Sequence, residues 1–259
     1  MTEPLLKIEN LTKEFGNLRA IDNSSFQISP DEIVGLIGPN GAGKTTTIRL
    51  IASILKPTSG RVIFKGEDIT TQATSYIINK GLAITHQVVK PFRHLPVLAN
   101  VMVSCLSPRA KKRGDWIKTV EIRARDALEF CGIGDLSLES AASLSHGDLK
   151  RLELARAIAT EPELLLLDEP FGGLNPAETT LIARSLKRLH KGGRFGRLHS
   201  EGPAMLIVEH KLSELMKIVD RVIVLNFGQL IASGTPEEIV NNKDVIKAYL
   251  GKEGGKLVS

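Results

Sequence analysis

The sequence predicts an α/β fold with a mainly parallel sheet, an N-terminal antiparallel β-subdomain and a helical subdomain inserted in the middle. Three observations predict this class. The apolar run 33–37 leads through a glycine-rich loop into a helical pattern. Four consecutive leucines at 164–167 fit a strand that is covered on both faces, as in a parallel sheet. Between about residues 88 and 160 the alternation of apolar and polar residues that marks strands disappears.

The N-terminal half supplies strands first and helices later. Residues 5–37 alternate and carry turn residues, so we expect antiparallel strands ahead of the strand at 33–37, with a further short strand at 61–66. Residues 121–130 are predicted to be helical, with Gly132 near the end of the helix. Farther along, apolar residues recur at every third position and form one helical face: Leu149, Leu152, Ala155 and Ile158.

The C-terminal half alternates strands with capped helices. A helix is predicted to start at Asn175–Pro176, and residues 204–208 read as another central strand. Residues 220–225 and 230–232 indicate a hairpin, and a capping box at 235–238 opens the last helix. The loop 192–203 carries no motif. We expect one domain over 1–259: residues 1–87 and 161–259 form the core, and residues 88–160 form the helical subdomain.

Composition excludes several classes of protein. The chain has 259 residues, 42% of them hydrophobic, which is enough for a sizeable core. Its net charge of +5 comes from 34 basic and 29 acidic residues spread along the chain, so we predict no nucleic-acid partner. Cys105 and Cys131 lack the spacing of a metal site and favour free, buried thiols. No signal peptide or apolar run of about 20 residues is present, so we expect a soluble protein or one held at a membrane by a partner.

A phosphate-binding loop follows the strand at 33–37. The pattern G-x-x-x-x-G-K-[ST] is matched at its fixed positions by Gly38, Gly43, Lys44 and Thr45. Its variable positions hold Pro39, Asn40, Gly41 and Ala42, and Thr46 follows. Such a loop points its backbone N–H groups at phosphates, beside the positive end of a helix. Lys44 is expected to reach the β- and γ-phosphates, and the Thr45 hydroxyl to ligate Mg²⁺. The strand before the loop and the helix after it argue against a chance glycine-rich turn.

Two acidic residues end the leucine strand. Asp168 and Glu169 stand at its carboxyl end, where ligands of open α/β sheets bind. Asp168 is therefore predicted to hold Mg²⁺, and Glu169 to polarise the attacking water. The alternative is an ordinary helix-capping pair before a proline, which the phosphate loop makes the weaker interpretation.

A third motif indicates a resemblance to one particular family of proteins. The segment 143–148, Ser-Leu-Ser-His-Gly-Asp, resembles the signature sequence of ATP-binding cassette ATPases, and the resemblance spans nearly the whole chain. It implies that Ser145 and Gly147 bind the ATP held by a second subunit. It also implies that Gln87 contacts Mg²⁺ and that His210 contacts the γ-phosphate. Both residues are then expected to act in catalysis with Lys44 and Glu169. By the same resemblance Phe15 stacks on adenine and 173–175 is the D-loop, although Phe15 could instead be a core residue.

The signature departs from the family pattern at two positions. His146 replaces a glycine and Asp148 replaces a glutamine of the usual Leu-Ser-Gly-Gly-Gln. A side chain at 146 hinders close approach of the backbone to phosphate, and Asp148 adds an anion near a triphosphate. We therefore expect His146→Gly with Asp148→Gln to raise the ATPase activity of the dimer.

Segments 168–176 and 234–251 look like the ATPase subunits of branched-chain amino acid importers. The resemblance implies ATP and Mg²⁺ as cofactors, and a second cassette, identical or different, bound head to tail. It also implies permease subunits, a periplasmic or extracellular substrate-binding protein, and a place on the cytoplasmic face of the plasma (inner) membrane. Urea import and lipopolysaccharide export remain alternatives, because their ATPases carry similar tails.

Two further classes stay open: a soluble cassette ATPase that acts without a permease, and a nucleotide-sensing subunit that does not hydrolyse ATP. The chain has one cassette and no long coiled coil, which disfavours the first class. The intact set Lys44, Asp168, Glu169 and His210 disfavours the second.

Overall fold

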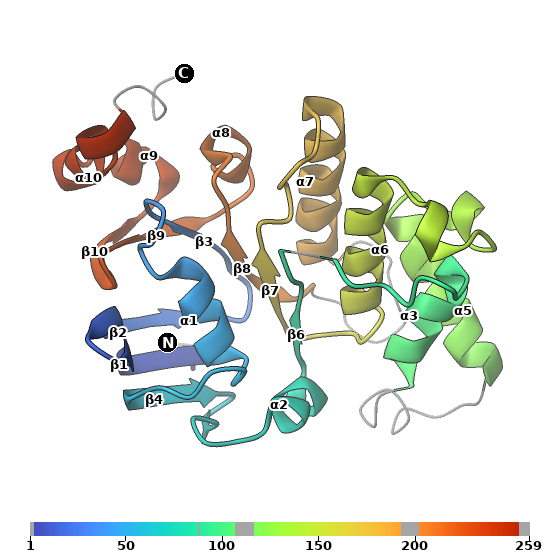
Figure 1. The fold of residues 1–259 in the computed structure, drawn as a ribbon, viewed down its shortest axis with the longest axis horizontal. Coiled ribbons are helices and arrows are strands. Elements are labelled where there is room, and N and C mark those ends of the chain that lie inside the picture. Colours follow the sequence, from blue (N-terminus) through green and yellow to red (C-terminus); the bar gives the residue numbers. More distant parts are fainter. Residues whose placement is uncertain (1–2, 88, 107–116, 193–201, 254–259) are drawn as a thin grey trace. The chain divides into compact units, whose positions relative to one another are not determined.

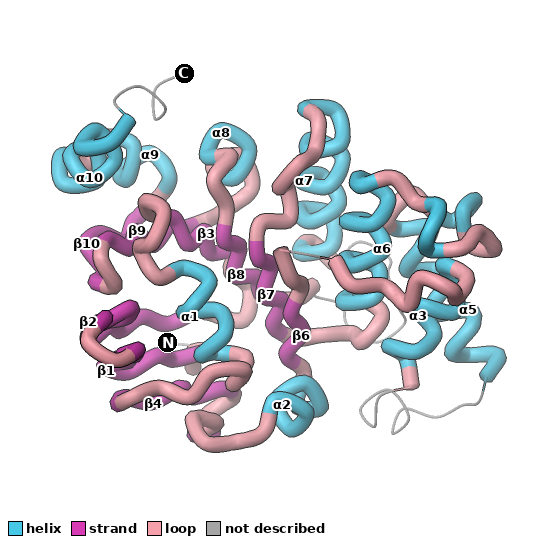
Figure 2. The backbone as a smooth tube through the Cα atoms, in the orientation of Figure 1, coloured by secondary structure: helices cyan, strands magenta, loops and turns pink. Residues whose placement is uncertain are grey.

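A computed structural model describes residues 3–87, 89–106, 117–192 and 202–253. These residues group into two compact units (Figures 1 and 2). Unit 1 comprises Met1–Ile77 and Ala204–Ser259, and unit 2 comprises Ile78–Pro203. The domain boundaries expected from the sequence, at residues 88 and 160, stay a prediction. Most of the predicted loop at 192–203 lies outside the described residues.

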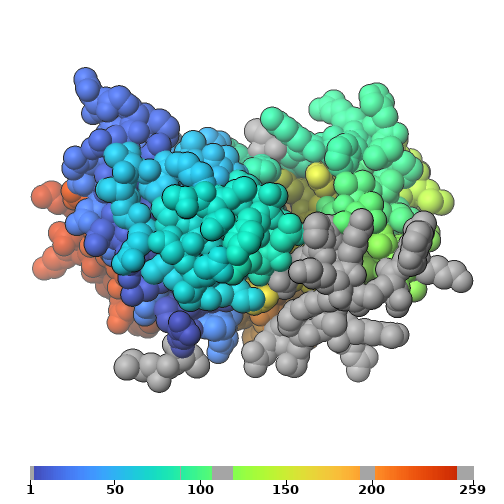
Figure 3. All heavy atoms as spheres, turned by 90° about the horizontal axis from the view of Figure 1, so that it is seen from below, coloured from blue at the N-terminus to red at the C-terminus, as the bar shows by residue number. Residues whose placement is uncertain are grey.

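The N-terminal strands of unit 1 form the expected antiparallel sheet. Strands β1 (Leu6–Phe15), β2 (Leu18–Ile28), β4 (Ser59–Phe64) and β5 (Glu67–Asp68) pair in the order β2-β1-β4-β5. Leu6 lies opposite both Ile28 and Phe64, and all three side chains are fully buried. The alternation in the sequence therefore reports one packed face of a sheet. In Figure 3, the N-terminal residues of unit 1 are coloured blue to cyan and cover most of the side of that unit that is seen.

Unit 1 also contains parallel strands, which position the phosphate loop. Strand β3 (Ile33–Ile37) lies between β8 (Ala204–Val208) and β9 (Arg221–Asn226) and is parallel to both. Strand β10 (Gln229–Gly234) pairs antiparallel with β9 and forms the predicted hairpin. Every residue of β3 and β8 is buried, as expected for central strands. Helix α1 (Lys44–Ile51) follows β3, and helix α8 (Leu212–Leu215) follows β8. Along the sequence, the boundary between the two units falls within α2 (Thr74–Lys80).

The C-terminus contains two helices where the sequence predicted one. The capping box at Thr235 opens α9 (Pro236–Val240) as expected, but this helix ends after five residues. The side chain of Asn242 then accepts hydrogen bonds from the N–H groups of Asp244 and Val245, and α10 (Lys243–Glu253) begins. Asparagine side chains compete with the helical backbone in this way, so the pair at 241–242 breaks the predicted helix.

Unit 2 contains the helical insert and two parallel strands, β6 (Leu82–Ile84) and β7 (Leu164–Asp168). The helices are α3 (Val97–Cys105), α5 (Ile117–Phe130), α6 (His146–Ile158) and α7 (Pro176–His190), with short 3₁₀ turns at 134–136 and 141–143. The prediction of a mainly helical segment is confirmed for the described residues. Cys105 and Cys131 are free and buried, as expected.

Candidate functional site

The phosphate loop has the backbone that its sequence predicts. It joins buried β3 to α1, whose first residue is Lys44. Gly43, at the start of the helix, has φ +103°, and a Cβ there would lie 2.6 Å from the carbonyl oxygen of Ala20. A Cβ on Gly38 would overlap the carbonyl oxygen of Leu225. Both positions therefore require glycine, for conformation and for space.

The side chain of Lys44 lies along the loop. It is 6% exposed, and its Nζ donates hydrogen bonds to the carbonyl oxygens of Gly38 at 2.7 Å and Pro39 at 3.0 Å. The ammonium group is thus already held within the loop that is expected to receive phosphates. Thr45, in the first turn of α1, is partly exposed.

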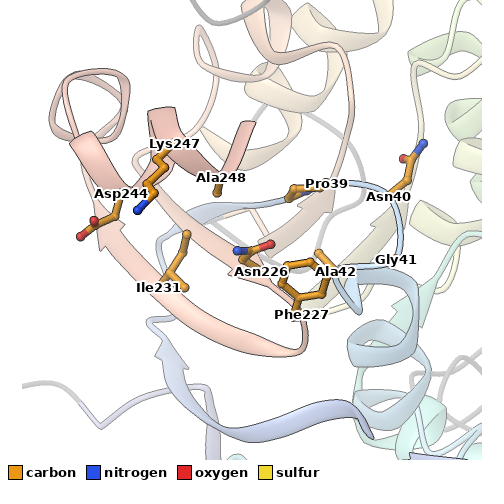
Figure 4. A pocket seen from close by; sticks show the side chains of 10 residues that line it. All are labelled: Pro39, Asn40, Gly41, Ala42, Asn226, Phe227, Ile231, Asp244, Lys247 and Ala248. Carbon is orange, nitrogen blue, oxygen red and sulfur yellow. The ribbon is translucent and has the colours of Figure 1, made fainter. Parts of the chain in front are cut away.

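The C-terminal hairpin and α10 support the same loop. Gly228 donates its N–H to the carbonyl of Ala42 at 3.1 Å. A cavity of about 630 Å³ lies between the loop, the hairpin and α10, and Figure 4 shows its lining. Tyr249 of α10 is hydrogen-bonded to the backbone of Gly38, and burial raises the pKa of its hydroxyl. The last helix is therefore part of the structure that holds the phosphate loop.

His210 lies at the same edge of the parallel strands. It follows β8, which pairs in parallel with β3, so both connections leave the sheet at neighbouring carboxyl ends. The carboxylate of Glu209 is 2% exposed and accepts the N–H groups of His210 and Lys211. This turn leaves His210 exposed. Sequence reasoning missed Glu209, although an acidic residue beside the histidine was visible.

Phe15 is not a core residue. Its side chain is 46% exposed at the end of β1, with the ammonium group of Lys13 5.0 Å from the ring centre. The alternative that it belongs to the core is therefore wrong, because a core aromatic would be covered. An exposed ring face is what stacking on a base requires.

Unit 2 brings Gln87 and Glu169 together. Gln87 follows β6, Glu169 follows β7, and these parallel strands end at the same edge. The Nε2 group of Gln87 donates to Oε2 of Glu169 at 2.9 Å. Asp168, the last residue of β7, is only 5% exposed. Glu169 has φ +51°, a left-handed conformation that is costly for a residue with a side chain.

The signature forms the start of α6. Ser145 is the N-cap: its Oγ accepts the N–H of Asp148 at 3.1 Å and donates to Asp148 Oδ2 at 2.6 Å. Nε2 of His146 lies 3.1 Å from the carbonyl oxygen of Gly172. Gly147 is buried against Glu178, and a Cβ there would overlap that carboxylate. The two unusual residues, His146 and Asp148, are thus both bonded within unit 2.

Several charged residues of α6 were missed by the sequence analysis. The predicted apolar face is buried except for Leu149, which is partly exposed. Lys150 and Glu153 are buried as well, with 6% and 8% exposure. Their spacing of three was visible, but polar residues at this spacing normally face water.

The donor atoms fit a magnesium ion. Mg²⁺ prefers hard oxygen ligands; within unit 2, Gln87 and Asp168 offer an amide and a carboxylate, and within unit 1 Thr45 offers a hydroxyl. Because Gln87 uses its Nε2 toward Glu169, its amide oxygen remains available as a ligand. Among the described residues, no group of three His, Cys, Asp or Glu side chains could hold a metal.

Comparison with sequence families identifies the class of protein. The family model described as ABC transporter matches residues 21–172, and the model described as Branched-chain amino acid ATP-binding cassette transporter matches residues 229–255. The LivG protein of Escherichia coli K12, a high-affinity branched-chain amino acid transport ATP-binding protein, is 36% identical over 97% of this chain and 100% of its own. The LptB protein of Haemophilus influenzae, from a lipopolysaccharide export system, is 30% identical over 96% of this chain and 98% of its own.

Solved structures agree. The ADP conformation of the cassette MJ1267 has a TM-score of 0.83 and 30% identity, over 97% of this chain and 100% of that one. A dimeric post-hydrolysis state of MJ0796 bound to ADP and Pi has a TM-score of 0.77 and 25% identity, over 89% of this chain and 98% of that one. None of the described helices has the length and apolar character to cross a bilayer. The chain belongs to the ABC transporter family, as an ATP-binding cassette ATPase.

Proposed function

We propose that this chain powers the import of branched-chain or other hydrophobic amino acids through partner permeases. The observation that carries the proposal is the match of residues 229–255 to the C-terminal segment of that transporter type. The full-length relatives LivG and BraF, 36% and 35% identical, support it. A role in lipopolysaccharide export is the second candidate, because LptB is 30% identical over 96% of the chain.

Two copies, or this chain and a related one, then meet head to tail. Each ATP lies between the phosphate loop of one subunit and Ser145 and Gly147 of the other. The N-terminus of α6 suits this role, because the first N–H groups of a helix favour phosphate. Phe15 stacks on adenine and His210 contacts the γ-phosphate. The exposure of both side chains supports this assignment.

Hydrolysis follows from the acids of unit 2. Thr45, Asp168 and Gln87 would hold Mg²⁺, and the ion would supply positive charge that offsets the charge of the phosphates. Glu169 polarises the attacking water, and the bond from Gln87 orients its carboxylate. Permease chains and a periplasmic or extracellular binding protein complete the importer, with this subunit at the cytoplasmic face of the inner membrane.

The catalytic part is tested by Glu169→Gln. We expect ATP binding to be retained and turnover to stop, because the amide keeps the shape but cannot accept a proton from water. Glu163→Gln, just before β7, is the matched control and should leave turnover unchanged. Normal turnover in Glu169→Gln would remove Glu169 from this role.

The transport part is tested with the tagged full-length chain, recovered from detergent-solubilised membranes. We expect two permease chains and a second cassette to co-purify. In proteoliposomes containing the binding protein, leucine should stimulate ATPase activity. Stimulation by lipopolysaccharide alone would favour the second candidate, and recovery with soluble partners only would overturn both.

A further inference from the structure

Helix α6, which starts at the signature, carries a charged row on one side. Lys150, Glu153 and Arg156 recur every three residues, so their side chains lie on one helical face. Lys150 and Glu153 are almost fully buried, and Arg156 is partly buried. Burying charges is costly unless hydrogen bonds compensate. The partners of these three groups therefore indicate why charges are found here.

Lys150 contacts Gln87 and Glu169, the two residues of unit 2 that are expected to act in ATP hydrolysis. Its Nζ donates to the carbonyl oxygen of Gln87 at 2.9 Å and to that of Glu169 at 3.2 Å. Gln87 and Glu169 are also joined to each other through their side chains. Glu169 has the left-handed backbone described above, which neighbouring contacts must hold in place. The lysine supplies one such contact from the signature helix.

The rest of the row holds the segment that contains Gln87. Oε1 of Glu153 accepts the N–H of His86 at 2.7 Å. The guanidinium group of Arg156 donates to the carbonyl oxygen of Lys90 at 3.3 Å and lies 5.6 Å from the ring centre of Phe92. Burial raises the pKa of Glu153, and the nearby Lys150 and Arg156 oppose that rise. One helical face thus bonds the backbone at residues 86, 87 and 90, and also at 169.

We propose that Lys150 is a positioning residue for ATP hydrolysis, whose ammonium group fixes the backbones of Gln87 and Glu169 relative to the signature helix. Glu153 and Arg156 extend the same contacts to His86, Lys90 and Phe92. The inference rests on the proposed roles of Gln87 and Glu169. Its consequence is that a displacement of α6, whose N-terminus is expected to meet the partner's ATP, moves the Gln87–Glu169 pair with it.

The experiment compares three variants of the full-length chain. Lys150→Met keeps an unbranched side chain of similar length but removes the ammonium group. Lys150→Arg keeps a cation that can donate to both carbonyls. Lys191→Met, at the exposed C-terminal end of α7, is the matched control. We also include the double variant Lys150→Met with Glu153→Gln, which removes both buried charges if the single variant does not fold.

In Lys150→Met we expect kcat for ATP to fall about tenfold or more, with KM and nucleotide Kd within about twofold of wild type. Lys150→Arg should recover most of the rate, and Lys191→Met should match wild type. Hydrogen exchange should become faster in peptides covering 86–92 and 168–174, and not in the phosphate loop at 38–46. A merely structural role predicts instead a lower Tm with faster exchange throughout the chain.

Two results would overturn the inference: unchanged kcat in a folded Lys150→Met protein, or unchanged exchange at both 86–92 and 168–174. The proposed role of Glu169 is judged separately, by Glu169→Gln alone. Normal turnover in that variant, together with faster local exchange in Lys150→Met, would reject the role of Glu169 and retain the positioning by Lys150.

Discussion

The signature residue Asp148 gives the sharpest test of how this chain binds ATP across two subunits. Its carboxylate accepts a hydrogen bond from the hydroxyl group of Ser145 at 2.6 Å. The serine hydroxyl therefore already donates to a group of its own subunit. If Ser145 donates to the γ-phosphate of the partner's ATP, that bond must first be broken. Asp148 also brings a negative charge to the site, and Arg151 offsets it only weakly from 3.6 Å. We predict that Asp148→Gln raises the apparent affinity of the assembled dimer for ATP.

The size of the effect follows from these contacts. A hydrogen bond to a charged group contributes about 1.5–3 kcal/mol, and the exposure of Ser145 places this bond at the low end. About 1.4 kcal/mol corresponds to a tenfold change, so KM for ATP should fall by about tenfold. The free energy of unfolding should fall by no more than about 2 kcal/mol, since the bond to Ser145 is lost as well. The lost acid in the first turn costs about 0.3–1 kcal/mol, but the introduced glutamine would complete a capping box with Ser145.

The assay is ATPase rate against ATP concentration for the assembled dimer, at low and high salt. Because electrostatic repulsion is screened by salt, the gain in affinity should be smaller at high ionic strength. Asp126→Asn, on the exposed side of α5, is the control and should change neither KM nor its salt dependence. An unchanged or higher KM in a stable Asp148→Gln dimer would refute the reasoning.

Three further predictions concern single residues. His146→Gly should lower the free energy of unfolding by about 1–2 kcal/mol in guanidinium titrations, because it removes the bond to Gly172 and places glycine in the first turn of α6; equal stability would show that this bond contributes nothing. Phe15→Ala should weaken binding of a fluorescent ATP analogue about tenfold while Phe15→Trp retains it, since stacking on a base contributes about 1–3 kcal/mol; equal affinity of all three proteins would reject stacking. Burial raises the pKa of Cys105 to about 11 and also raises the pKa of Cys131. At pH 8 both thiols therefore stay protonated, and they should react with a thiol reagent only after unfolding. Rapid labelling of the folded chain would contradict this.

The structure gives different roles to the two unusual signature residues, His146 and Asp148. The sequence alone suggested that His146→Gly and Asp148→Gln together raise activity, since both residues depart from the family pattern. The bond from His146 to Gly172 now gives the histidine a stabilising role, whereas the bond from Asp148 restrains Ser145. We therefore expect the gain in activity to come from Asp148→Gln, and the double variant to be less stable than that single variant.

Local chemistry explains what the sequence could predict. The phosphate loop needs glycine at fixed positions for conformation and space, so its spacing alone located β3, the loop and α1. The capping boxes at Asn175 and Thr235 were predictable for the same reason, because each is formed within four residues. The break between α9 and α10 was missed, since apolar residues continue on both sides of Asn242 and the periodicity masks the cap.

Contacts that are distant in sequence explain what could not be predicted. The partners of Lys150 are 63 residues before it and 19 residues after it. A lysine on a helix normally indicates a solvated face, and no local signal shows that two backbone carbonyls will meet its ammonium group. The contact of Glu153 could not be predicted for the same reason, because its partner, His86, is 67 residues away in the sequence.

The contacts around the phosphate loop and those around α6 lead to one further expectation about variants. In unit 1, the groups expected to hold ATP are linked to one another: Lys44 bonds Gly38, and Tyr249 bonds the same glycine from α10. In unit 2, the groups expected to act on water are linked through α6. Because Tyr249 supports the phosphate loop and has no expected part in the reaction, Tyr249→Phe should alter nucleotide affinity and leave the rate at saturation nearly intact. Lys150→Met should do the reverse, so the two variants separate support of the nucleotide from positioning of the residues that act in hydrolysis.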